Sequence, residues 1–65
     1  MLVIKCSSTN VIGKVYISMV KSDGSYDIGR TPKTWKSYIE AKKAYDSIAN
    51  VMGAAFTNNF AIAAN

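Results

Sequence analysis

The chain has 65 residues and a mass of 7.1 kDa, and its residues are 49% hydrophobic and 18% charged. This composition is typical of a globular protein rather than a disordered segment, and the length allows one domain only. The sequence has no histidine and a single cysteine, which excludes a histidine-based catalytic triad, a zinc finger and a disulfide framework. We therefore expect one domain over residues 1–65 that holds no metal and no cofactor.

The charge of the chain is basic and unevenly distributed. Eight lysine and arginine residues against four acidic residues give a net charge of +4, and no charged side chain follows Asp46. A charge of this size attracts an acidic protein surface or a polyanion, but it is modest beside dedicated nucleic-acid-binding domains. The first residues lack the long apolar core of a signal peptide or membrane span. We expect a cytoplasmic protein that does not enter a membrane and keeps Cys6 as a reduced thiol.

Alternation of apolar and polar residues predicts strands in the first half of the chain. Residues 2–6 form the first strand and residues 14–20 the second. An Asp23-Gly24 turn follows, because glycine accepts a positive φ and aspartate bonds to the backbone ahead of it. Residues 26–29 are therefore expected to return antiparallel as the second arm of a hairpin.

A connection and a helix are predicted next. Residues 30–36 contain Pro32, which disfavours helical backbone at the residue before it. Ser37 and Glu40 match the capping box, in which the serine side chain accepts a hydrogen bond from the backbone N–H of the glutamate. Gly53 provides the matching stop.

Between these two ends, apolar side chains recur every three or four residues, which is the spacing of one helix face. They are Ala41, Ala44, Tyr45, Ile48, Val51 and Met52. The other side is polar and carries Lys42, Lys43, Asp46 and Asn50. Residues 54–65 are expected to form a last strand, with a frayed end as the alternative.

The predicted order is β-β-β-α-β, an α+β fold in which one amphipathic helix covers one face of a three- to four-stranded, mostly antiparallel sheet. The side facing the helix is expected to carry Leu2, Ile4, Val15, Ile17 and Met19. The open side is expected to display Val3, Lys5, Lys14, Tyr16, Ser18 and Val20. The stretch 15–50 resembles the strand, turn, strand, helix unit of YegP-like domains, which usually contain two such units where this chain has one.

Two short motifs match known chemistry in spacing alone. Ser18 and Lys21 have the spacing of a serine nucleophile and its lysine, but on a strand this spacing directs them to opposite faces. Asp23, Ser25 and Asp27 resemble the start of a calcium loop, but a threonine stands where the closing glutamate is required. We therefore expect that the chain is not an enzyme.

The main candidate binding surface is the connection and helix start, which carry several cations and two large aromatic side chains. It comprises Arg30, Lys33, Trp35, Lys36, Tyr38, Lys42 and Lys43. Tryptophan, tyrosine and arginine carry much of the binding energy of protein interfaces, although Trp35 has an equally weighted alternative role as a lid on the core. The pattern favours a protein-binding modulator or inhibitor, of the kind that phages and mobile elements encode against a larger host or defence complex. Its partner would be a protein or ribonucleoprotein with an acidic surface.

Tyr16 supports a second hypothesis, because an aromatic ring flanked by Lys5 and Lys14 on an open sheet can stack on a base beside a phosphate. Stacking platforms usually offer two or three aromatic rings, so the alternative function is weak, sequence-independent binding of single-stranded nucleic acid. The uncharged stretch 54–65 also lacks a charged residue that would prevent edge pairing, which makes a homodimer a further expectation.

Overall fold

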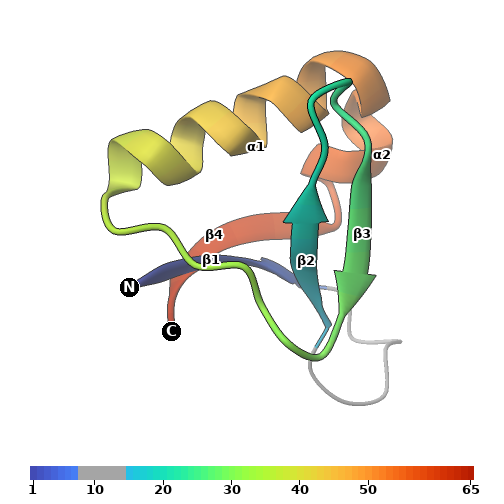
Figure 1. Ribbon diagram of the computed structural model, residues 1–65. Helices are drawn as coiled ribbons and strands as arrows, with labels where there is room; N and C mark the ends of the chain where they lie inside the picture. Colours follow the sequence, from blue (N-terminus) through green and yellow to red (C-terminus); the bar gives the residue numbers. More distant parts are fainter. Residues whose placement is uncertain (8–14) are drawn as a thin grey trace.

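The computed structural model describes residues 1–7 and 15–65 (Figure 1). Its elements are β1 (Leu2–Cys6), β2 (Tyr16–Val20), β3 (Tyr26–Gly29), α1 (Tyr38–Met52), α2 (Ala54–Thr57) and β4 (Phe60–Ala64). The four strands form an antiparallel sheet in the order β3-β2-β1-β4, and α1 packs against it. The predicted α+β fold is confirmed, while Lys14, the predicted start of the second strand, lies outside the described residues.

In the part of the chain that the structure describes, the sheet consists of two antiparallel ribbons that meet where β1 pairs with β2. β1 pairs with β4 along its whole length, and β2 pairs with β3. Among the described residues, β1 and β2 are paired at Lys5 and Tyr16, next to a hydrogen bond from the N–H of Cys6 to the carbonyl of Val15 at 2.8 Å. In Figure 1, β1 and β4 run across the view in the direction of α1, whereas β2 and β3 run steeply up and down. The two ribbons therefore diverge on one side of this junction.

The connection between β3 and α1 fills the gap between the ribbons. The N–H of Trp35 donates to the carbonyl of Leu2 at 2.9 Å, and the N–H of Leu2 donates to the carbonyl of Trp35 at 2.8 Å. The N–H of Lys33 donates to the carbonyl of Ile17, on the other ribbon, at 2.9 Å. The connection thus supplies hydrogen-bond partners for the backbone groups of Leu2 on β1 and of Ile17 on β2.

The core lies between α1, α2 and the sheet. Its buried members form one cluster: Ile4, Ile17, Trp35, Ala41, Ile48 and Phe56. The prediction that Ile17 and Ile48 belong to a common core is confirmed. Trp35 is only 8% exposed, so the structure has it in its alternative role as part of the core.

A β-bulge changes which side chains of β2 face the core. The register between β2 and β3 shifts between Ile17 and Met19, and an extra residue at a bulge reverses the alternation beyond it. Met19, predicted to face the helix, is therefore 52% exposed, whereas Val20, predicted on the open face, packs against the core. Val3, also predicted to be displayed, is buried because β1 has a strand on each side.

α1 begins and ends at the predicted residues. The side-chain oxygen of Ser37 accepts a hydrogen bond from the backbone N–H of Glu40 at 3.3 Å. Gly53 ends the helix with a φ of 63°, and its N–H donates to the carbonyl of Ala49 at 2.8 Å. Both predicted helix signals are therefore confirmed.

The chain after Gly53 differs from the predicted continuous strand, because Ala54–Thr57 form α2 and only Phe60–Ala64 form β4. α2 directs Phe56 into the core, where its ring stacks on that of Phe60 with 5.0 Å between the centroids. Val51 and Met52, predicted to face the core, are exposed because the last turn of α1 lies beside the β2–β3 turn instead of over a strand.

Candidate functional site

The start of α1 carries exposed apolar and aromatic side chains among lysines. Tyr38 is 58% exposed and Ile39 is 72% exposed. An α-helix turns about 100° per residue, so Ile39 points away from the side on which Ile48 enters the core. We call the following residues the helix-start surface: Lys36, Tyr38, Ile39, Lys42 and Lys43.

The lysines of the helix-start surface differ in their partners. Nζ of Lys42 lies 2.8 Å from Oδ1 of Asp46, and this hydrogen bond raises the pKa of Lys42 above its ordinary value. The same ammonium group lies 5.7 Å from the ring centroid of Tyr45. Among the described residues, Lys36 and Lys43 form no ion pair. The helix-start surface therefore carries two lysines outside the ion pairs of the described residues, with the exposed Glu40 as the acidic residue of the same helix turn.

A groove of about 430 Å³ runs along the side of α1 that faces the β2–β3 turn. The helix lines it with side chains three and four positions apart: Glu40, Lys43, Ala44 and Ser47. The remaining lining comes from Val20, Lys21, Ser22, Gly24 and Trp35. Lys43 thus belongs to both the groove and the helix-start surface.

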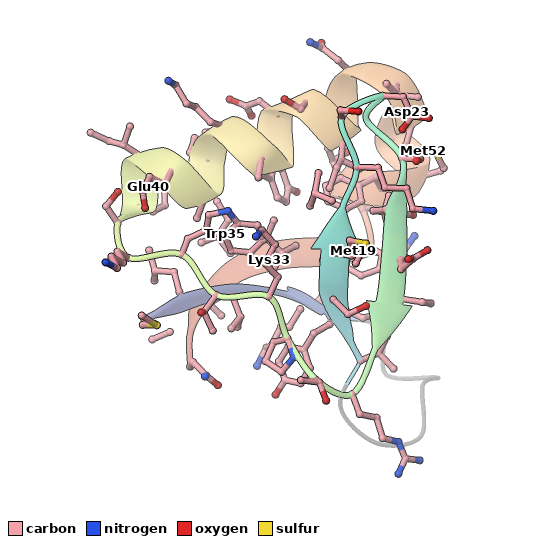
Figure 2. The ribbon with its side chains drawn as sticks, viewed as in Figure 1. Met19, Asp23, Lys33, Trp35, Glu40 and Met52 are labelled. Atoms are coloured by element: carbon pink, nitrogen blue, oxygen red, sulfur yellow. The ribbon has the colours of Figure 1, made fainter. Side chains whose placement is uncertain are left out.

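Trp35 lines this groove but offers little free surface to a partner. Its side chain is part of the core cluster, and Nζ of Lys33 lies 5.7 Å from its ring centroid, within the range of a cation–π contact. Figure 2 shows both side chains below the first half of α1. Trp35 therefore packs in the core below the helix-start surface, and its ring contacts the ammonium group of Lys33.

The structure brings together most of the predicted binding residues but not all of them. Arg30 follows β3 at the end of that strand remote from α1 (Figure 1). It is exposed, but it lies at the opposite end of the connection from the helix-start surface.

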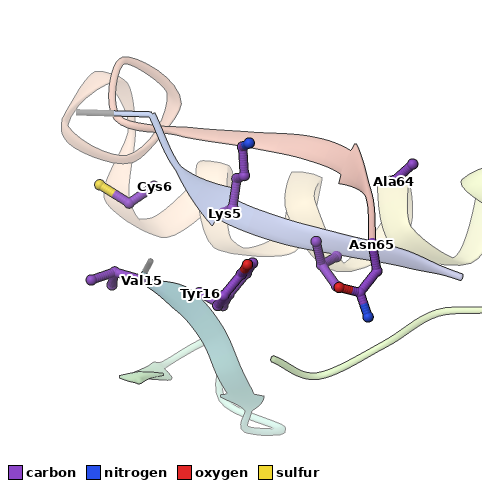
Figure 3. Close-up of a pocket in the computed structure, with 7 residues that line it drawn as sticks. Lys5, Cys6, Val15, Tyr16, Ala64 and Asn65 are labelled. Atoms are coloured by element: carbon purple, nitrogen blue, oxygen red, sulfur yellow. The ribbon is translucent and has the colours of Figure 1, made fainter. Parts of the chain in front are cut away.

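A second, smaller pocket of about 200 Å³ contains the described residues of the nucleic-acid hypothesis (Figure 3). Lys5 and Tyr16 are cross-strand neighbours there, and Tyr16 is half-buried. The pocket is completed by Val3, Cys6, Val15, Ala64 and Asn65. Lys14, the third residue of that hypothesis, lies outside the described residues.

Sequence reasoning missed two sets of exposed apolar side chains. Ile39 could have been found, because helical spacing places it opposite Ile48. The other set lies in an apolar groove of about 570 Å³ at the far end of α1. It is formed by Asp23, Gly24, Ser25, Tyr26, Ile28, Val51 and Met52. No local pattern indicates this groove, since it depends on where the β2–β3 turn meets the helix.

The motifs considered for chemistry have structural partners. Lys21 lies 3.7 Å from Asp27 in an ion pair, and the carboxylate of Asp23 accepts hydrogen bonds from the N–H and the hydroxyl of Ser25 at 2.9 and 2.6 Å. Within residues 1–7 and 15–65, no group of three cysteine, aspartate or glutamate side chains is placed to hold a metal ion.

Comparison of the chain with protein families, with curated proteins and with solved structures found no match. In the part of the chain that the structure describes, no helix is both long enough and apolar enough to cross a membrane.

Proposed function

We propose that this chain is a non-enzymatic protein-binding modulator that docks on an acidic surface of a larger protein or ribonucleoprotein. The docking site is the helix-start surface. The observation that supports it is the exposure of Tyr38 and Ile39 beside Lys36 and Lys43, which form no ion pair in the described part of the chain. Apolar and aromatic anchors within a charged rim are the arrangement that protein interfaces use.

The support beneath the helix-start surface also favours docking. The Ser37 cap fixes the first turn of α1, and Trp35, two residues before the cap, is held by two backbone hydrogen bonds to Leu2. A surface that is already ordered loses little conformational entropy when it binds. A small rigid module of this kind acts by covering part of its partner, which is the mode of action of an inhibitor of a larger host or defence complex.

Affinity capture tests the proposal. The double variant Tyr38→Ala/Ile39→Ala should bind the captured partner at least about thirtyfold more weakly, because a true anchor contributes about 2 kcal/mol or more. Both side chains are exposed, so circular dichroism should show an unchanged fold. Asn50→Ala, an exposed position on the same helix, is the matched control and should bind as the parent does. If the parent, the double variant and Asn50→Ala capture the partner equally well, the helix-start surface is not the docking site.

The pairing of Lys5 with Tyr16 favours a second candidate function, weak sequence-independent binding of single-stranded nucleic acid at the smaller pocket. A fluorescent mixed-sequence oligonucleotide tests it. Log K should fall with log salt by about 0.7 per phosphate contacted, and Tyr16→Ala should remove about 1–3 kcal/mol of stacking. Tyr38→Ala should leave this binding unchanged, which separates it from protein docking.

A further inference from the structure

The outer edge of β4 is a surface that the proposed function does not use. β4 is the last strand in the order β3-β2-β1-β4, so within residues 1–7 and 15–65 it has a strand partner on one side only. An edge of this kind presents backbone donors and acceptors in a row, ready to pair with another strand.

The hydrogen bonds at the end of the ladder show which backbone groups of β4 point outward. The N–H of Asn65 donates to the carbonyl of Met1 at 3.0 Å. Antiparallel partners alternate between bonded and non-bonded pairs, so residues 61 and 63 bond to β1 as well. The residues whose N–H and C=O groups point away from β1 are Phe60, Ile62 and Ala64.

A side-chain contact agrees with this assignment. The hydroxyl of Tyr45 on α1 donates to the carbonyl of Phe60 at 2.8 Å, as an outward carbonyl allows, and the N–H of Ser7 donates to the carbonyl of the neighbouring Asn59 at 2.7 Å. α1 thus covers one end of the edge. Among the described residues, no side chain donates to or accepts from the outward backbone groups of Ile62 and Ala64.

The two edges of the sheet differ in how they are protected. The ladder of β3 with β2 contains a bulge, and β3 carries Asp27 in an ion pair with Lys21. Bulges and charged side chains are among the devices that prevent edge pairing. β4 is regularly paired and has no charged side chain. As far as the described residues show, the fold therefore leaves the edge of β4 open at Ile62 and Ala64 and protects the edge of β3.

We infer that β4 pairs with β4 of a second copy of this chain, antiparallel about a two-fold axis at Ile62. In this register Ile62 faces its counterpart and Phe60 faces Ala64 of the other copy, so every outward N–H and C=O of both strands finds a partner. The Phe60 carbonyl keeps its bond from Tyr45, because a carbonyl oxygen accepts two hydrogen bonds. The two sheets join into one continuous sheet.

Electrostatics distinguishes this contact from the proposed docking on an acidic partner. Each copy carries a net charge of +4, so the two copies repel each other and added salt strengthens the dimer by screening. Salt weakens binding to an acidic surface, because there it screens an attraction. Two short strands bury little area, so the dimer is weak and depends on concentration. Its existence does not depend on the proposed function.

Sedimentation over a range from low micromolar to millimolar chain tests the inference. The parent should shift from monomer to dimer, with more dimer at higher salt. Ala64→Pro removes an outward N–H and no bond to β1, so it should weaken self-association by about tenfold or more. Ala61→Lys adds a charge to the uncharged strand and should do the same. Ala55→Lys, the same change on exposed α2, is the control and should dimerise nearly as the parent does.

Amide hydrogen exchange provides the second readout and does not need a variant. The amides of Ile62 and Ala64 should become protected as concentration rises, while those of Ala61 and Ala63 should be protected throughout because they bond to β1. A chain that stays monomeric at millimolar concentration overturns the inference. So does a dimer that Ala64→Pro and Ala61→Lys leave unchanged, or one in which the Ile62 amide still exchanges rapidly.

Discussion

The backbones of Leu2 and Trp35 exchange two hydrogen bonds, of 2.8 and 2.9 Å, although the two residues lie in different halves of the chain. This pair extends the sheet beyond the junction of its two ribbons and directs the indole of Trp35 into the core. A residue two positions before the Ser37 helix cap is therefore part of the sheet and of the core at once.

Trp35→Ala should consequently unfold the protein. Removing a buried tryptophan costs about 3–5 kcal/mol, which is comparable to a total stability of about 3–10 kcal/mol for a domain of this length. Trp35→Phe should remain folded, since it keeps an aromatic ring in the site. Circular dichroism and thermal melting of both variants measure this. A cooperative melt of Trp35→Ala close to that of the parent would contradict the position of Trp35 in the core. If Trp35→Ala unfolds as expected, a loss of partner binding by this variant says nothing about docking.

The two isoleucines on opposite sides of α1 offer a matched comparison. Ile48 is fully buried and Ile39 is 72% exposed. Ile48→Ala should cost about 2–5 kcal/mol, whereas Ile39→Ala should change stability by less than about 0.5 kcal/mol. Chemical denaturation of the two variants measures both values. Equal losses would show that the helix is rotated relative to the orientation described.

Gly24 and Gly53 both have a positive φ, of 87° and 63°, but their surroundings differ. A Cβ at Gly24 would lie 3.1 Å from Cγ2 of Val51, whereas a Cβ at Gly53 would meet nothing within 4 Å. Gly53→Ala should cost about 1–3 kcal/mol from backbone strain alone, and Gly24→Ala about 1 kcal/mol more from the close contact.

Val51→Ala provides the control for this comparison. It should recover the additional loss in the Gly24→Ala background and recover nothing in the Gly53→Ala background, as measured by denaturation. The same rescue in both backgrounds would mean that the β2–β3 turn does not pack against the end of α1.

Several features of the fold could be predicted because their signals are local. The alternation in β1 and the Ser37 and Gly53 helix ends depend on neighbouring residues only. The bulge before Met19 could not be predicted, because an inserted residue in a strand leaves no mark in the alternation until its partner strand is known. The position of α2 could not be predicted either, because it depends on the packing of Phe56 against the rings of Tyr26 and Tyr45, which are distant in the sequence.

The candidate site shows the same division. The lysines and Tyr38 at the helix start follow from the sequence and the position of the helix cap. Helical spacing also predicts that Ile39 lies opposite the core face of the helix, but only the fold shows that its side chain is exposed and free to contact a partner. The position of Trp35 could not be decided from its neighbours, because it depends on a gap between two ribbons that come together only in the folded chain.

The β2–β3 turn should contribute stability in a pH-dependent way. Hydrogen bonds from the hydroxyl and then the N–H of Ser25 hold the pKa of Asp23 below its ordinary value of 3.8. The folded pKa is the lower one, so this contribution is present above the ordinary pKa and is lost as pH falls through the folded pKa. Asp23→Ala should melt below the parent at about pH 6, and the difference should shrink as the pH falls below the ordinary pKa of 3.8. A difference that is constant with pH would contradict this origin.

Site-directed photo-crosslinking tests the central claim, docking through the helix-start surface, most directly. A benzophenone amino acid replaces Tyr38 in one chain, Tyr16 in a second and Asn50 in a third, and each is irradiated in an extract of the organism that encodes the protein. The account predicts one crosslinked protein from position 38, displaced by excess unmodified chain and reduced by salt, and none from position 16. Crosslinking from position 16 without crosslinking from position 38 would contradict it.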